Sequence, residues 1–165
     1  MRVLEVGAGP ISNIGRHHPT KEIQLTPTDV LAKEYDRLLA ARSLKPPVPT
    51  VYADAEHLSQ FFAPNSFDLV YAGNCLDHMS NPRQAIEEMV KVVRPGGWIV
   101  LFHRANEAEQ QDYAGLHQWN LSADEGRFIL WTPTQRVDIT ELLAAECGTH
   151  TSLIDGHVWV EITKH

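Results

Sequence analysis

The sequence predicts an α/β fold, a three-layer sandwich whose central, mostly parallel sheet ends in an antiparallel C-terminal hairpin. Three observations support this prediction. Short apolar runs rich in β-branched residues alternate with segments of helical spacing, the order that builds parallel sheets through crossover connections. The first run, 3–6, stops in a Gly-x-Gly turn. The last two runs flank Asp155-Gly156, which is typical of a hairpin turn.

The first two thirds of the chain predict five strands separated by helices. Apolar runs place the strands at 3–6, 22–26, 50–52, 67–71 and 98–102. Helical spacing of apolar residues, and Asn81-Pro82 as a helix start, predict the helices. We expect these helices at 11–18, from 30 to the Pro46-Pro47 pair, and from 82 to 93.

The last third predicts a different arrangement. Segment 104–126 is long and polar, and we expect it to form a lid insertion, because long connections in compact domains are uncommon unless they are functional. An extra strand is expected at 128–131 and a helix at 137–146, and the closing strands 149–154 and 157–162 should pair antiparallel. The length predicts a single domain over 1–165.

Composition and charge exclude several classes of partner. The formal net charge of -7 argues against a surface that holds phosphate backbones, so nucleic acid is not expected. No apolar run approaches the roughly 20 residues of a membrane span, and no leader precedes the first strand, so no membrane partner is expected. The two cysteines, Cys75 and Cys147, show neither a disulfide framework nor metal-ligand spacing. We therefore expect a cytoplasmic protein with reduced thiols.

The glycine turn is the first functional signal. Gly7 and Gly9 permit backbone angles and a close ligand approach that a Cβ blocks. A strand followed by such a turn is shared by proteins that bind nicotinamide dinucleotides and by proteins that bind S-adenosylmethionine. Ser12 stands where the dinucleotide fingerprint has a third glycine or alanine, which counts against the nicotinamide alternative.

Further motifs follow in a characteristic order. They are Glu5-Val6-Gly7-Ala8-Gly9, Asp29, Asp54-Ala55-Glu56, Phe67-Asp68-Leu69-Val70 with Asn74, Leu76 and His78, and Arg94-Pro95-Gly96-Gly97-Trp98. In this order they resemble the class I S-adenosylmethionine-dependent methyltransferases, and the resemblance runs from Met1 to about Phe102. It implies a Rossmann-like methyltransferase fold with S-adenosylmethionine as the cofactor.

The resemblance also implies roles for individual residues. Asp29 would accept hydrogen bonds from two ribose hydroxyls, Asp54 would contact the adenine amino group and Glu5 would hold the ammonium of the methionine tail. Asp29 and Asp54 also fit helix caps, and Asn74 fits a plain loop residue. The complete set expected to bind the cofactor is Glu5, Gly7, Ala8, Gly9, Pro10, Asp29, Val30, Asp54, Ala55, Asn74, Cys75 and Leu76.

The acceptor side of the site carries weaker signals. His103 follows the fifth strand and His78 follows the fourth, so either neutral imidazole is a candidate to accept a proton from the substrate, with a structural role as the alternative. In the lid, Tyr113, His117 and Trp119 are candidates to bind the substrate, or simply to cover the sheet. The histidines show no His-x3-His or Cys/His spacing, so no metal site is expected.

Together these features predict a methyltransferase that acts on a small-molecule acceptor. The abrupt start at Met1 leaves three alternatives for the N-terminal side of the pocket: the lid at 104–126 covers it alone, a second copy or a partner chain completes it, or the natural chain is longer. Two other functions stay open: a cofactor-binding or partner-activating subunit without activity, and a nicotinamide-dependent oxidoreductase.

Overall fold

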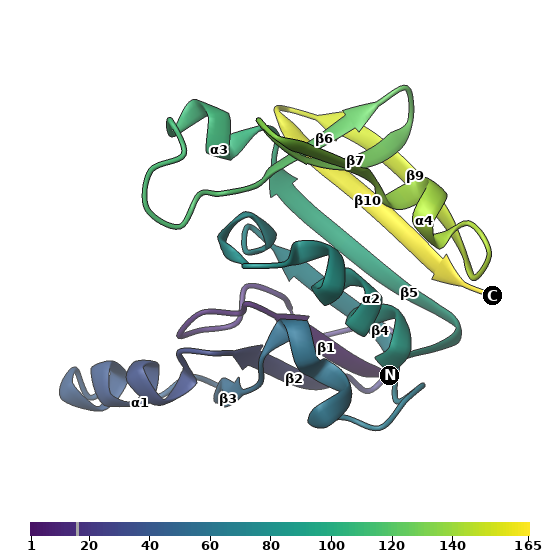
Figure 1. Cartoon of the computed structure of the whole chain (residues 1–165). Coiled ribbons are helices and arrows are strands. Elements are labelled where there is room, and N and C mark those ends of the chain that lie inside the picture. Colours follow the sequence, from purple (N-terminus) through teal and green to yellow (C-terminus); the bar gives the residue numbers. More distant parts are fainter. Residues whose placement is uncertain (16) are drawn as a thin grey trace.

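Two sheets organise the chain in the computed structural model, which describes residues 1–15 and 17–165 (Figure 1). The main sheet contains β1 (Arg2–Val6), β2 (Gln24–Asp29), β3 (Val51–Tyr52), β4 (Phe67–Gly73), β5 (Val93–Arg104), β9 (Cys147–Ile154) and β10 (His157–Lys164). The smaller sheet contains β6 (Asn120–Asp124), β7 (Arg127–Thr132) and β8 (Gln135–Asp138). The helices are α1 (Ala32–Ala41), α2 (Pro82–Val92), α3 (Glu107–Gln110) and α4 (Ile139–Leu143), with 3-10 helices η1 (Ala55–Gln60) and η2 (Leu76–His78).

The main sheet confirms the predicted fold class. Its order is β3-β2-β1-β4-β5-β10-β9. Strands β1 to β5 pair in parallel, whereas β10 runs antiparallel to both β5 and β9. The hairpin forms around Asp155 and Gly156, whose φ angles of 48° and 76° suit a tight turn. The sheet is thus mostly parallel and closes in the predicted antiparallel hairpin.

The second strand lies further along the chain than predicted. We expected 22–26, but β2 covers Gln24–Asp29 and includes Pro27. Because β3 pairs only with Thr28 and Asp29, Pro27 lies beyond the paired part of that edge, where the missing amide hydrogen is tolerated. The shift places Asp29 as the last residue of the strand.

Helix α2 covers one face of the main sheet. Asn81 caps it by accepting a hydrogen bond from the Gln84 amide at 3.2 Å, and Pro82 occupies the first turn, as the sequence predicts. The apolar stripe of α2 is buried against alternate residues of β1, β4 and β5, which together form the main core. Within this core Met89 has no exposed surface.

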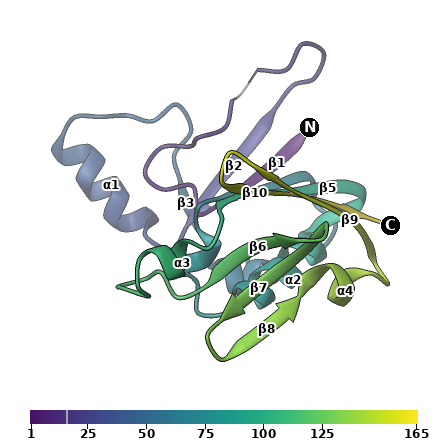
Figure 2. The same ribbon diagram turned by 90° about the horizontal axis from the view of Figure 1, so that it is seen from above.

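The opposite face carries a connection instead of the expected helix. Residues 11–15 and 17–18 are not helical, and residue 16 lies outside the described part. Ser12 exchanges hydrogen bonds with the Ile14 backbone, and the Asn13 amide donates to Glu5, so local side-chain contacts replace helical ones. Figure 2 shows this connection on the side of the sheet opposite to α2 and the smaller sheet.

The last third builds the smaller sheet, which the sequence did not predict. Strand β7 contains the expected run 128–131, but β6 and β8 pair with it on either side. The helix expected at 137–146 is limited to α4, because Val137 and Asp138 belong to β8 and the Asp138 carboxylate caps α4 at the Glu141 amide. No helix in residues 1–15 and 17–165 is both long and apolar enough to cross a membrane.

Candidate functional site

A cavity of about 380 Å³ opens where β1, β2 and β4 end. This is the edge at which parallel sheets place their ligand sites. Residues expected to act in the site contribute Gly7, Asp29, Val30, Asp54, Ala55, Cys75 and His78 to its lining. Sequence reasoning missed the other lining residues, which are Val6, Leu31, Tyr35, Ala53, Glu56, Met79, Ser80 and Leu116. Most of these residues are adjacent in the sequence to a predicted site residue. This adjacency was the signal that could have identified them.

The glycine turn is fixed by its neighbours. Gly7 and Gly9 have φ angles of 66° and 68°, the left-handed region that glycine adopts without strain. Between them the buried Ala8 donates its amide to the Thr28 carbonyl at 3.0 Å. A Cβ on Gly9 would meet nothing within 4 Å, but the turn lines the cavity through Gly7 and not through Ala8 or Gly9. Pro10, which follows, is exposed and does not line the cavity.

Glu5 lies beneath this turn with its side chain buried. Its Oε1 accepts a hydrogen bond from the Asn13 amide at 3.0 Å. Its Oε2 is also buried and has no hydrogen-bond partner among the described residues. A buried carboxylate oxygen without a partner is costly, and Glu5 is not among the residues that line the cavity.

Asp29 lines the cavity, and both of its carboxylate oxygens accept hydrogen bonds from backbone amides. Oδ2 accepts from the Gly9 amide at 3.1 Å and Oδ1 accepts from the Leu31 amide at 2.9 Å. Each oxygen has a second lone pair, so two further donors can bind at once. Leu31, with no side-chain hydrogen bond, occupies the N-cap of α1, so Asp29 is not the cap of this helix. Burial and the Asp29 charge raise the pKa of the nearby Tyr35 phenol, which keeps it a hydrogen-bond donor.

A second acidic group lies on the other side of the cavity, at the start of η1. Asp54 caps this helix by accepting from the Glu56 amide at 2.9 Å, and its other oxygen lies 2.9 Å from Nδ1 of His57. Glu56 accepts from the Asn81 amide at 2.8 Å and so links η1 to the start of α2. The helix-cap role of Asp54 and a ligand contact are compatible, because the carboxylate retains free lone pairs.

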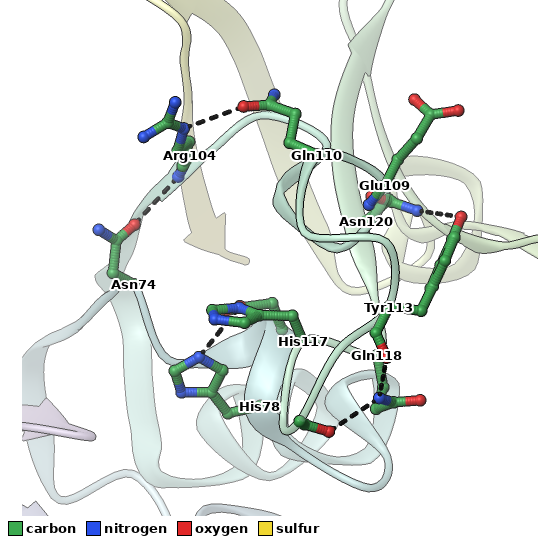
Figure 3. Close-up of polar contacts among 11 residues, drawn as sticks. Asn74, His78, Arg104, Glu109, Gln110, Tyr113, His117, Gln118 and Asn120 are labelled. Atoms are coloured by element: carbon green, nitrogen blue, oxygen red, sulfur yellow. Dashed lines mark hydrogen bonds and ion pairs between the residues drawn. The ribbon is translucent and has the colours of Figure 1, made fainter.

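The residues after β4 have three different positions. Cys75 lines the cavity, and its Sγ donates to the Val6 carbonyl at 3.4 Å. Burial raises the pKa of this thiol far above its ordinary value, so it is not a nucleophile. Asn74, with a φ of 47°, accepts from the Arg104 amide at 3.0 Å and thereby ties the ends of β4 and β5 together (Figure 3). Leu76 is fully buried in the core.

Two histidines and a carboxylate meet beside the cavity. His78 Nε2 lies 3.2 Å from His117 Nδ1 (Figure 3). The same His117 nitrogen lies 2.7 Å from Oδ2 of Asp77. Asp77 is almost completely buried, and its ion-pair partners within the described residues are these two histidines. The sequence predicted roles for His78 and His117 independently but none for Asp77. The available signal for Asp77 was its position directly before His78, in η2 after β4.

The remaining predicted residues do not line the cavity. His103 is 2% exposed, and neither ring nitrogen has a hydrogen-bond partner among the described residues. Burial, with a smaller contribution from His78, lowers the pKa of His103 to about 3, so this ring is neutral at physiological pH. The Tyr113 hydroxyl accepts a hydrogen bond from Asn120 at 3.0 Å. Trp119 packs in the hydrophobic core.

Residues 4–101 match a protein family described as "Methyltransferase domain". This match covers more than half of the chain and includes the glycine turn and both acidic residues of the cavity. The chain belongs to this methyltransferase family.

Relatives of this methyltransferase domain include two curated proteins. Polyketide synthase 19 from Gibberella fujikuroi is 30% identical over 146 residues, 84% of this chain and 6% of that protein. The chloroplastic tocopherol O-methyltransferase from Arabidopsis thaliana is 30% identical over 164 residues, 94% of this chain and 43% of that protein. The methyltransferase domain thus spans less than half the length of either relative.

The fold has counterparts among solved structures. An S-adenosylmethionine-dependent methyltransferase from Methanosarcina mazei aligns with a TM-score of 0.58 and 19% identity, covering 99% of this chain and 92% of the other. At this identity the likeness concerns the fold alone.

Proposed function

We propose that this methyltransferase domain transfers a methyl group from S-adenosylmethionine to a small-molecule acceptor that lies between the cavity and the Asp77, His78 and His117 cluster. The observation that carries the proposal is continuity: one cavity is lined by the glycine turn, by Asp29 and Asp54, and by His78. Cofactor-binding groups and candidate proton acceptors therefore face the same space.

The chain offers groups that match each part of the cofactor. The free lone pairs of Asp29 suit two ribose hydroxyls, and Asp54 suits the adenine amino group. The buried Oε2 of Glu5 suits the ammonium of the methionine tail. When bound, S-adenosylmethionine supplies a methyl group that its sulfonium charge already activates.

Placement and proton removal are the tasks left to the protein. A ring nitrogen of His78 or His117 accepts the proton of the acceptor, and the buried Asp77 stabilises the imidazolium that forms. The buried His103 stays neutral, so it adds no positive charge that would oppose this proton transfer. Leu116 lines the cavity next to His117 and helps to exclude water from the acceptor.

Two observations support a small acceptor. The names of the two curated relatives refer to polyketides and tocopherol, both of which are small molecules. The net charge of -7 disfavours nucleic acid.

Two buried free cysteines are consistent with a reducing compartment, so we propose the cytoplasm as the location.

Calorimetric titration of the purified chain with S-adenosylmethionine, S-adenosylhomocysteine and NAD tests the proposal. We expect both adenosyl compounds to bind with one equivalent and NAD to bind at least tenfold more weakly. Formation of S-adenosylhomocysteine with a panel of phenols and β-ketoacyl compounds then tests transfer. Preferential binding of NAD would contradict the proposal, and cofactor binding without transfer to any acceptor would favour a non-catalytic subunit.

A further inference from the structure

The two rings and the carboxylate of the Asp77, His78 and His117 cluster hold three ligand atoms at a spacing that hydrogen bonds explain poorly. The separations are 2.7 Å between His117 Nδ1 and Asp77 Oδ2, 3.2 Å between His78 Nε2 and Asp77 Oδ2, and 3.2 Å between the two ring nitrogens. Figure 3 shows the two rings pointing toward each other from different segments. From their geometry we propose that this cluster binds a divalent transition-metal ion of the Zn²⁺ type, with an open coordination position facing the cavity.

Proton counting supports an ion at this place. A carboxylate only accepts, and a neutral imidazole carries one N–H, so at most two of the three contacts can be hydrogen bonds at the same time. If both facing nitrogens carry protons, two N–H groups lie 3.2 Å apart and repel each other. A single cation between the three atoms would accept a lone pair from each of them, so no proton would be needed at any of the three contacts.

The distances agree with coordination. Nitrogen and oxygen ligands lie about 2.0–2.2 Å from Zn²⁺, which places neighbouring ligands about 2.8–3.6 Å apart at angles between octahedral and tetrahedral values. The observed separations of 2.7–3.2 Å fall at or close to this range. Two imidazoles and one carboxylate form a donor set that suits borderline divalent ions.

Burial and backbone contacts hold the ligands in place. The Asp77 side chain is 3% exposed, and no lysine or arginine among the described residues pairs with it. A buried carboxylate needs a cationic partner. The Gln118 amide donates to the Asp77 carbonyl at 3.1 Å, which joins the segment of His117 to η2. Sequence spacing gave no sign of this site, because His78 and His117 are 39 positions apart.

The open side of the site indicates what else the ion would bind. His78 lines the cavity, and its side chain is 39% exposed, so the fourth position faces the space where the acceptor is proposed to lie. This part of the inference rests on the proposed function. An acceptor oxygen bound there would lose its O–H proton to solvent water and stay on the ion as an oxyanion, so the ion would replace an imidazole as the agent of deprotonation. The preferred acceptors would then carry a hydroxyl or enol oxygen.

Metal titration of the tag-free, chelator-treated chain tests the site. We expect one equivalent of Co²⁺ to bind and produce visible absorption bands, and Zn²⁺ to displace it. His117→Gln and Asp77→Asn should each weaken binding by about tenfold or more. His150→Ala, which removes an exposed histidine of β9, is the matched control and should bind as the wild type does.

Thermal unfolding of the metal-free variants verifies that they are folded. His117→Gln is the safer variant, because the His117 side chain is 28% exposed whereas that of Asp77 is 3% exposed. Absence of stoichiometric binding, or affinities within twofold of wild type in both variants, would overturn the inference. Titration of the same samples with S-adenosylhomocysteine separates the two proposals: cofactor binding without metal binding refutes the metal site alone, whereas metal binding without cofactor binding supports the metal site and refutes the proposed function.

Discussion

Gly7 and Cys75 lie so close together that a Cβ on Gly7 would be 2.5 Å from the Cβ and 2.7 Å from the Sγ of Cys75. Cys75 is itself held in place, because its thiol donates to the Val6 carbonyl and its side chain is buried. The glycine is therefore required by contact between the ends of β1 and β4, in addition to any ligand. The sequence indicated the backbone angles of the turn and the approach of a ligand, but not this contact with Cys75.

This contact predicts different effects at the two glycines of the turn. Gly7→Ala should lower the free energy of unfolding by about 2–4 kcal/mol, because strain at positive φ adds to a clash with Cys75. Gly9→Ala has the same φ strain but open space, so it should lower this free energy by only about 1–2 kcal/mol. Urea unfolding measures both, and equal effects would show that Cys75 moves aside freely.

Asp29→Ala should weaken S-adenosylhomocysteine binding by about 1.5–3 kcal/mol while the fold survives, because two charged acceptor sites are lost. Calorimetry measures the affinity and circular dichroism verifies the fold. Asp36→Ala, an exposed change on α1 away from the cavity, is the control and should bind normally. Wild-type affinity in folded Asp29→Ala would mean that Asp29 only supports the turn.

Both cysteines should be unreactive in the native protein. Burial raises the pKa of the Cys75 thiol and, together with Glu146, that of Cys147, so little thiolate is present even at mildly alkaline pH. At pH 8 we expect alkylation of both residues to be at least tenfold slower in buffer than in urea, as followed by mass spectrometry. Rapid labelling of native Cys75 would show that the cavity exposes its sulfur.

Asp68 should stabilise the fold at neutral pH and lose this effect in acid. Hydrogen bonds from Arg94 and from the Arg2 amide, each at 2.7 Å, lower the pKa of Asp68 in the folded chain. Its contribution is therefore complete above the unfolded pKa of about 3.9 and is lost as the pH falls through the lower folded value. Because the pair is partly exposed, Asp68→Asn should cost about 1 kcal/mol at pH 7.

Urea unfolding at several pH values measures this difference. The two proteins should converge below pH 3, and Asp36→Asn should show no such pH dependence. A constant difference down to pH 2 would mean that the Asp68 charge does not carry the effect.

Elements with strong local signals were predictable from the sequence. Asn81-Pro82 started α2 and Asp155-Gly156 formed the hairpin turn, because capping and turn chemistry act over a few residues. The smaller sheet was missed because β6 is short and its sequence, Asn-Leu-Ser-Ala-Asp, is largely polar. The residues of β6 have little intrinsic preference for a strand, and pairing with β7 stabilises the strand conformation instead.

The same distinction applies to the site. Asp29 and Asp54 were predicted to bind the cofactor because of the resemblance in motif order. Both line the cavity with Gly7, because the strands of a parallel sheet end at one edge. The contact between Asp77 and His117 depends on the path of segment 111–119, which no local pattern determines.

The same path buries Trp119 in the core, so Trp119→Ala should mainly lower the free energy of unfolding, by about 3–5 kcal/mol.

The lid predicted at 104–126 is therefore better tested at Leu116, whose side chain is 66% exposed and lines the cavity. Leu116→Ser should change the free energy of unfolding by no more than about 0.5 kcal/mol, because little buried surface is lost. If segment 111–119 closes over the ligands, S-adenosylhomocysteine should slow its cleavage in limited proteolysis of the wild type, and Leu116→Ser should reduce this protection. Leu153→Ser, an equally exposed change in β9, is the control and should keep it. Equal cleavage with and without S-adenosylhomocysteine would show that the segment is a fixed cover, and the acceptor would then have to enter past His78 without any movement of the lid.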